Sequence, residues 1–146
     1  MRSAMPTIHR PLISPVLFPY RRRKARVVMV GNVGVGGDNP LRLQSMTTTR
    51  TQDTEATVDQ AVRLIRAGCE IVRITAPTEV DAANLKNIAA ALHGKGLKIP
   101  LVADIHFRPD AALEAAEHVE KVRINPGNFS DAKAFKIREY SDAQYN

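Results

Sequence analysis

Six polar or charged side chains interrupt segments of the sequence that are otherwise apolar and rich in β-branched residues. They are Gln44, Arg73, Asp104, His106, Arg123 and Asn125. Two guanidinium groups that meet at one site can bind a phosphate or diphosphate through paired hydrogen bonds. We therefore predict that these six residues bind an anionic, phosphate-bearing ligand, and we assign no catalytic residue and no metal ligand with them.

Other interpretations of the same residues stay open at this point. Arg73 and Arg123 could be structural groups that pair with Asp104 or Glu70. Asp104 and His106 could form a metal pair or an acid/base pair. Because two residues make a weak metal or catalytic pattern, we favour for them a role in orienting the arginines or in hydrogen bonding to substrate oxygens.

Short apolar segments alternate with segments of helical periodicity, which predicts the elements that carry these residues. Asp53 is an expected helix N-cap, Thr78 and Asp81 resemble a capping box, and Pro109 suits a first helical position. The predicted strands are 41–46, 70–75, 99–103 and 121–124, and the predicted helices are 54–67, 79–93 and 109–116. A hairpin is expected before them, formed by 26–30 and 32–35 around Gly31 and followed by turn residues 36–40.

This alternation predicts an α/β fold with a parallel sheet and crossover helices. The spacing suits a doubly wound sheet or a (β/α)₈ barrel, of which about four βα units would be the N-terminal half. Side chains two apart on a strand share a face, so Arg73 pairs with Thr75, Asp104 with His106, and Arg123 with Asn125. Ligands of such folds bind at the carboxyl ends of the strands, so we expect a polar mouth there.

The charge of the chain is concentrated at its beginning. The 146 residues carry a formal net charge of +6, but residues 1–26 hold seven basic groups and no acid, leaving 14 basic and 15 acidic groups in 27–146. We expect 1–25 to be a disordered basic leader, because four prolines oppose a helix there. With 5% aromatic residues and no long apolar run, we predict neither a nucleic-acid partner nor a membrane span.

Cysteine and glycine usage narrows the chemistry further. The chain has one cysteine, Cys69, which excludes an internal disulfide, a zinc ribbon and a self-contained four-cysteine iron–sulfur site. We interpret Cys69 as a small packing residue. Gly34, Gly36 and Gly37 lack the spacing of a phosphate loop, and we interpret them as turn residues.

Several longer motifs together resemble a known enzyme family. They are Gly31-Asn32-Val33, the run from Gln44 to Thr51 (Gln-Ser-Met-Thr-Thr-Thr-Arg-Thr), Glu55-Ala56-Thr57-Val58, Ile71-Val72-Arg73-Ile74, the run from Pro100 to Phe107 (Pro-Leu-Val-Ala-Asp-Ile-His-Phe) and Arg123-Ile124-Asn125-Pro126-Gly127-Asn128. In this order they resemble the 4-hydroxy-3-methylbut-2-enyl diphosphate synthases of the methylerythritol phosphate route to isoprenoids. The resemblance covers residues 21–128.

The resemblance implies a fold, a reaction and several partners. It implies a TIM-type barrel that binds 2-C-methyl-D-erythritol 2,4-cyclodiphosphate at its mouth, with Arg73 and Arg123 at the diphosphate. It further implies two-electron reductive ring opening at a [4Fe–4S] cluster on a separate C-terminal domain, with ferredoxin or flavodoxin as electron donor. A homodimer of the full-length enzyme is implied, in the bacterial cytoplasm, or in a plastid if the leader is a transit peptide.

The chain departs from the family pattern because it lacks the cysteine ligands of the iron–sulfur cluster. Cys69 matches no cluster ligand, so we expect 26–128 to be a partial, substrate-binding barrel that is inactive alone. Residues 129–146 are expected to begin the next helix or a linker, and they resemble the lead-in of the longer plant- or chlamydia-like members. Two alternatives are a pterin transferase barrel similar to dihydropteroate synthase and a non-enzymatic binding module.

Overall fold

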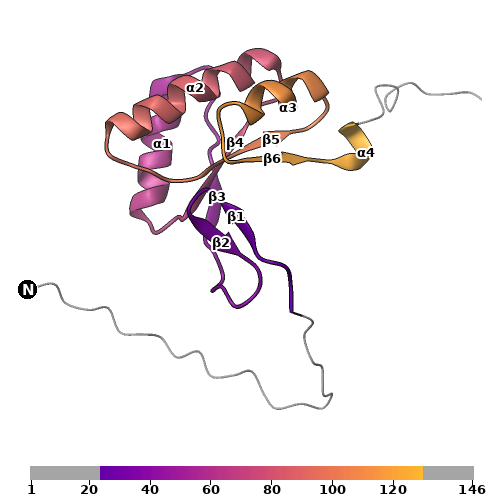
Figure 1. Ribbon diagram of the computed structural model, residues 1–146. Helices are drawn as coiled ribbons and strands as arrows, with labels where there is room; N and C mark the ends of the chain where they lie inside the picture. The colour runs from indigo at the N-terminus through magenta and orange to yellow at the C-terminus, as the bar shows by residue number, and fades with distance from the viewer. Residues whose placement is uncertain (1–23, 130–146) are drawn as a thin grey trace, which may run out of the picture.

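The computed structural model describes residues 24–129, which form an α/β structure around a four-stranded parallel sheet (Figure 1). Across the sheet the strands are β3 (Gln44–Met46), β4 (Ile71–Thr75), β5 (Leu101–Ile105) and β6 (Lys121–Ile124). The helices are α1 (Thr54–Arg66), α2 (Glu79–Gly94) and α3 (Pro109–Ala116), with a single turn, α4 (Pro126–Phe129), after β6. Each strand is added next to its predecessor, which is the order of a barrel, whereas a doubly wound sheet reverses direction at a switch point.

Helices cover one face of the sheet and form the main core with it (Figure 1). Alternate strand residues such as Val72, Ile74 and Ile105 point to this side and are fully buried. They pack with Leu85 and Ile88 of α2, which are also fully buried. The predicted alternation of polar and apolar positions thus divides the sheet into a helix-covered face and a second face, named here the inner face.

An antiparallel hairpin precedes the sheet, as the sequence predicts. It consists of β1 (Val28–Val30) and β2 (Val33–Val35), joined by the two residues Gly31 and Asn32. Gly31 has a φ of +56°, the left-handed conformation that such short hairpin loops need. The turn interpretation is confirmed for Gly36 and Gly37, which have φ values of +86° and +57°, and a Cβ at Gly36 would lie 2.4 Å from the Arg26 carbonyl oxygen. It is wrong for Gly34, which is the middle residue of β2 and pairs with Met29.

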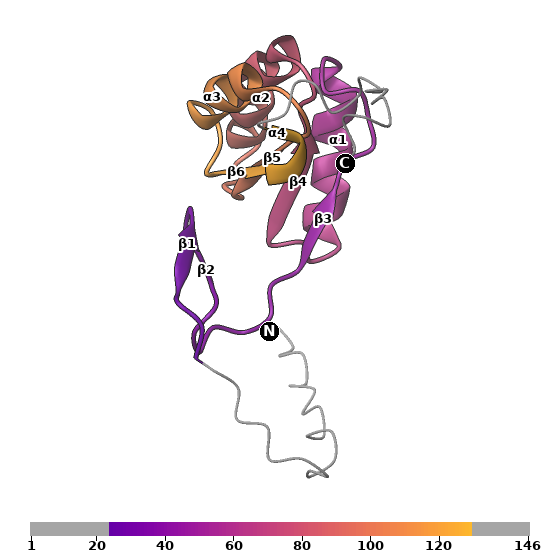
Figure 2. The ribbon, with the colours of Figure 1, turned by 90° about the vertical axis from the view of Figure 1, so that its right-hand side faces the viewer.

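The hairpin covers the amino-terminal end of the inner face. Val30 is buried together with Ile71 and Val102, the inner-face residues near the start of β4 and β5, and Val33 packs against them. Figure 2 shows the hairpin on the side of the sheet away from the helices. The inner face is therefore closed by apolar contacts at one end, and its polar residues lie toward the carboxyl ends of the strands.

The amino-terminal boundaries of β3 and β5 differ from the predicted ones for identifiable reasons; β4 also starts one residue later and β5 ends two residues later than predicted. β5 begins at Leu101 and not at residue 99, because Pro100 has no N–H to donate to the ladder, although its carbonyl oxygen accepts from the Val72 N–H at 3.1 Å. β3 begins at Gln44 and not at residue 41, because the N–H of Leu43 donates to the Glu70 carboxylate at 2.9 Å instead of joining the ladder. In sequence alone, both strands look longer at their amino ends than they are.

The predicted leader 1–25 and the predicted final segment 129–146 fall outside the described residues, apart from Lys24, Ala25 and Phe129. Within residues 24–129, the structure has no helix with the length and apolar character needed to cross a membrane.

Replacing Leu85 with alanine tests the helix-covered core. The side chain is fully buried, so its loss leaves a cavity, and we expect the free energy of unfolding to fall by about 2–5 kcal/mol in urea denaturation. Leu113→Ala is the matched control, because Leu113 on α3 is 74% exposed and its truncation should cost less than about 0.5 kcal/mol. Equal effects of the two substitutions would contradict the assigned core.

Candidate functional site

The inner face brings three of the predicted site residues into one ionic cluster. Asp104 on β5 accepts a hydrogen bond from Nη1 of Arg123 on β6 at 2.8 Å, and its other oxygen lies 3.3 Å from Nε of Arg73 on β4. The carboxylate is 3% exposed, whereas the side chains of Arg73 and Arg123 are 30% and 41% exposed. A single buried carboxylate therefore joins two partly exposed guanidinium groups, a set named here the Arg–Asp–Arg cluster.

Strand register explains why these side chains meet. Thr75 is paired with Asp104 and Asp104 with Arg123, so their side chains lie in one row across the sheet. Arg73 lies two residues before Thr75 on the same face, paired with Met46 on one side and Val102 on the other. The length of the arginine side chain lets its guanidinium reach the Asp104 row from the row before it.

This geometry decides between the two structural pairings considered for the arginines. Pairing with Asp104 is confirmed, and pairing with Glu70 is wrong. The Glu70 carboxylate instead binds the Leu43 N–H and, at 2.8 Å, Nη1 of Arg42. The backbone hydrogen bond from Leu43, and after it the Arg42 guanidinium, lower the pKa of Glu70 below its ordinary value.

The contacts of Arg73 leave part of its guanidinium available. Nε approaches both Asp104 and, at 3.3 Å, the Met46 sulfur. Among residues 24–129, no hydrogen bond from either Nη atom of Arg73 is present, and Arg123 engages only Nη1. Free N–H groups on two neighbouring guanidiniums are the donors that a phosphate oxygen needs.

A pocket of about 570 Å³ opens at the carboxyl ends of β3 and β4. Its lining comes from the loop 49–53, from Thr75 and Pro77 after β4, and from Asp81 on α2. Thr75 also belongs to the inner-face row of Asp104, so the pocket adjoins that row, although Arg73, Asp104 and Arg123 do not line it. Its volume is within the range of small-molecule sites.

Side chains from two helices hold the pocket loop in place. Gln60 on α1 accepts hydrogen bonds from the backbone N–H groups of Thr48 and Thr49 at 2.9 and 3.2 Å. Asn84 on α2 donates to the Thr51 carbonyl oxygen at 2.7 Å. Sequence reasoning missed Gln60 and Asn84, because a single amide on an amphipathic helix carries no signal of the distant loop that it binds.

The other predicted site residues occupy different positions. Asn125 follows β6, and its side-chain oxygen accepts from the Gly127 N–H at 3.2 Å, inside α4. His106 is half-buried one residue beyond β5, beside the ring of Phe107. Gln44 is a correction, because it is the first residue of β3, level with Ile71, and so does not lie at a strand tip.

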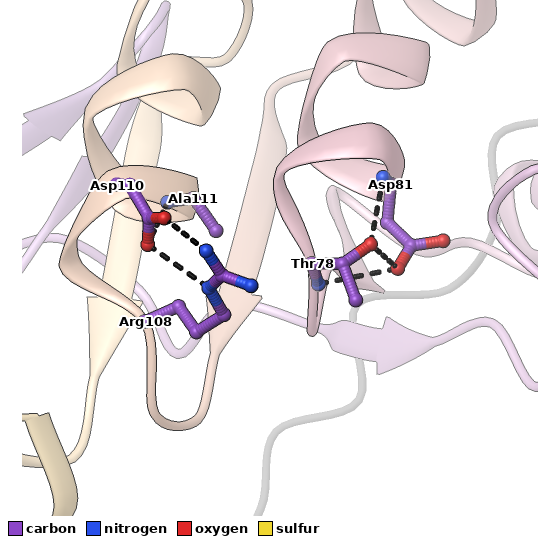
Figure 3. Close-up of polar contacts among 5 residues, drawn as sticks. All are labelled: Thr78, Asp81, Arg108, Asp110 and Ala111. Carbon is purple, nitrogen blue, oxygen red and sulfur yellow. Dashed lines mark hydrogen bonds and ion pairs between the residues drawn. The ribbon is translucent and has the colours of Figure 1, made fainter. Parts of the chain in front are cut away.

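The loops after β4 and β5 lead into α2 and α3, and the first residues of these helices make polar contacts at the rim of the site (Figure 3). The N-cap residue of α3, Arg108, makes no side-chain cap hydrogen bond. The capping box is confirmed, since the Thr78 side chain accepts from the Asp81 N–H and the Asp81 carboxylate accepts from the Thr78 N–H. At the start of α3, the Arg108 guanidinium forms an ion pair with Asp110, whose carboxylate also accepts from the Ala111 N–H. The Arg108 hydrogen bond lowers the pKa of Asp110, and the Asp110 carboxylate raises that of Arg108.

The described residues do not fit an iron–sulfur cluster. Cys69 is the only cysteine of the sequence, and its thiol donates to the Ile71 carbonyl oxygen at 2.9 Å near the amino-terminal end of β4, away from the mouth. Within 24–129, no group of three or more histidine, cysteine or acidic side chains could hold a metal ion. A cluster bound by several thiolates needs ligands that these side chains do not supply.

Comparisons with known proteins agree with this geometry. Residues 25–143 match the GcpE TIM-barrel domain family. Three bacterial proteins named 4-hydroxy-3-methylbut-2-en-1-yl diphosphate synthase (flavodoxin) are similar to the chain. The protein of Akkermansia muciniphila is 63% identical over 90% of this chain, that of Leptospira interrogans 57% over 88%, and that of Protochlamydia amoebophila 53% over 85%. The chain spans 22%, 20% and 19% of their lengths, about a fifth.

Substituting Asp104 with asparagine tests the Arg–Asp–Arg cluster. The amide keeps the shape but leaves two guanidiniums facing each other without a counter-charge. We expect the free energy of unfolding to fall by about 1–3 kcal/mol in urea denaturation at low salt, and added phosphate to restore part of the loss. Asp59→Asn, at an exposed position of α1, is the control and should change stability by less than about 0.5 kcal/mol. An Asp104→Asn variant with an unchanged free energy of unfolding would contradict the assigned cluster.

Substituting Arg108 with glutamine tests the rim ion pair. The pKa of Asp110 should rise toward its ordinary value, as followed by NMR titration of the carboxyl carbon. Because the folded-state pKa of Asp110 is lowered, the pair stabilises the protein above the ordinary aspartate range, and this contribution is lost as the pH falls through the lowered pKa. The variant should show less acid-dependent loss of stability. High salt should reduce the difference in acid-dependent stability between the variant and the unaltered protein, since both groups are about half exposed.

Proposed function

The chain belongs to the GcpE TIM-barrel domain family, and on this basis we propose that it forms the diphosphate-binding part of a 4-hydroxy-3-methylbut-2-en-1-yl diphosphate synthase. The observation that carries the proposal is the Arg–Asp–Arg cluster, which presents two guanidiniums beside a pocket at the carboxyl ends of parallel strands. The family match favours this function over a pterin transferase barrel and over a non-enzymatic binding module.

The proposed substrate is 2-C-methyl-D-erythritol 2,4-cyclodiphosphate. Its diphosphate would accept hydrogen bonds from the free N–H groups of Arg73 and Arg123, which face it as planar donor pairs. Asp104 would hold both guanidiniums in position before the ligand binds. Binding would then cost little side-chain entropy at the two arginines. Thr75 and the hydroxyl-bearing loop 49–53 would contact the carbon skeleton and its oxygens in the pocket.

The overall reaction of such a synthase opens the cyclic diphosphate with two electrons and the loss of water. One cysteine cannot hold the [4Fe–4S] cluster expected to pass these electrons, so we propose that other residues than these 146 bind it. The role of the present chain is then to bind and orient the substrate. The names of the relatives suggest flavodoxin as the electron donor. We further propose a cytoplasmic, homodimeric enzyme.

Calorimetric titration with the cyclodiphosphate tests this function. We expect Arg73→Gln and Arg123→Gln each to weaken binding by about ten- to hundred-fold, because each removes a charged hydrogen-bond donor to the ligand. Arg66→Gln is the matched control, since Arg66 is an exposed arginine in the last turn of α1, and it should bind as the unaltered chain does. Preference for a pterin diphosphate over the cyclodiphosphate would contradict the proposal.

A further inference from the structure

The sulfur of Met46 lies within the predicted binding site. Met46 is paired with Arg73 across β3 and β4, so both side chains are on the inner face. Its Sδ lies 3.3 Å from Arg73 Nε and 3.7 Å from Thr75 Oγ1, and both groups are hydrogen-bond donors. The residue is 37% exposed, so small solutes can reach it from the open end of the face.

Packing alone does not account for a methionine with these contacts. Leucine has a similar volume and would cover the sheet equally well, but it cannot accept a hydrogen bond. The thioether is apolar and still accepts weakly from N–H and O–H donors. Nε of Arg73 donates its N–H to the Met46 sulfur and also forms an ion pair with Asp104, so residues of β3 and β5 both hold the guanidinium while its Nη groups stay available.

We propose that Met46 is a positioning residue for Arg73 and that oxidation of its sulfur by a peroxide weakens anion binding at the site. In this step the sulfur gains one oxygen atom from the peroxide, the O–O bond breaks, and the peroxide is reduced to water or an alcohol. The sulfur is oxidised by two electrons to the sulfoxide. The inference rests on the proposed function, because it concerns binding to the same two arginines.

The geometry gives the direction of the effect. The present separation of 3.3 Å between Sδ and Nε is a direct contact, with no room for an oxygen atom between the two. The sulfoxide oxygen is also a stronger acceptor than the thioether. It would either push the guanidinium away or bind the N–H groups that the ligand needs, and both outcomes lower the affinity for a diphosphate.

The positioning role is tested with Met46→Leu and calorimetric titration of the cyclodiphosphate and of inorganic pyrophosphate. We expect the dissociation constant to rise about three- to ten-fold for both ligands, the effect of one modest hydrogen bond. The thermal midpoint should stay the same, because the volume is kept. In an Arg73→Lys background, which has no Nε donor, Met46→Leu should add little to the loss of affinity.

The oxidation step is tested by treating the unaltered chain with hydrogen peroxide and mapping sulfoxides by mass spectrometry. Met29 on β1 is the internal control, because it is 58% exposed and lies on the hairpin. Pyrophosphate should slow oxidation of Met46 several-fold and leave the rate at Met29 unchanged. Peroxide treatment should weaken ligand binding in the unaltered chain and in Met29→Leu, whereas Met46→Leu should lose no further affinity.

The outcomes separate this inference from the proposed function. If the unaltered chain binds the cyclodiphosphate while Met46→Leu binds it equally well, Met46 has only a packing role and the inference is overturned. Oxidation of Met46 without a change in affinity would also overturn it. If the unaltered chain binds neither ligand, the proposed function itself fails.

Discussion

One buried carboxylate makes the inner face of this sheet possible. Two arginines on neighbouring strands would repel each other on a surface partly removed from water, and each would lose hydration. Asp104 offsets both effects, because each of its oxygens approaches a different guanidinium and its side chain is almost completely enclosed. The polar face therefore exists as a stable arrangement, independent of any ligand.

The rest of the described structure keeps that arrangement at the edge of the sheet. The helices bury one face in a continuous apolar core, and the hairpin closes the amino-terminal end of the other face. The Arg–Asp–Arg cluster is then left toward the carboxyl ends of the strands. The loop 49–53 next to them is bound by amide side chains from two helices, so the pocket is shaped by the same helices that stabilise the core.

The sequence predicts the order of the elements, their caps and the shared face of Arg73, Asp104 and Arg123, because these follow from periods of two and of about 3.6 residues. It does not predict the partners across strands, since register sets whether Arg73 meets Asp104 or Glu70. For the same reason, the roles of Met46 and Gln60 appear only in three dimensions. Gln44 shows the same limit, because the register pairs it with Ile71 at the start of β4 and so places it two rows below the row of Asp104.

Within the Arg–Asp–Arg cluster, some guanidinium N–H groups stabilise the fold while others remain available for a ligand. A guanidinium carries five N–H groups in one plane, and a carboxylate that meets one edge leaves the others free. Asp104 contacts Nε of Arg73 and Nη1 of Arg123, so the fold uses a minor part of each group. One negative and two positive charges leave a net positive charge facing the mouth. That excess would attract a phosphate-bearing ligand, while the enclosed carboxylate would weaken the attraction.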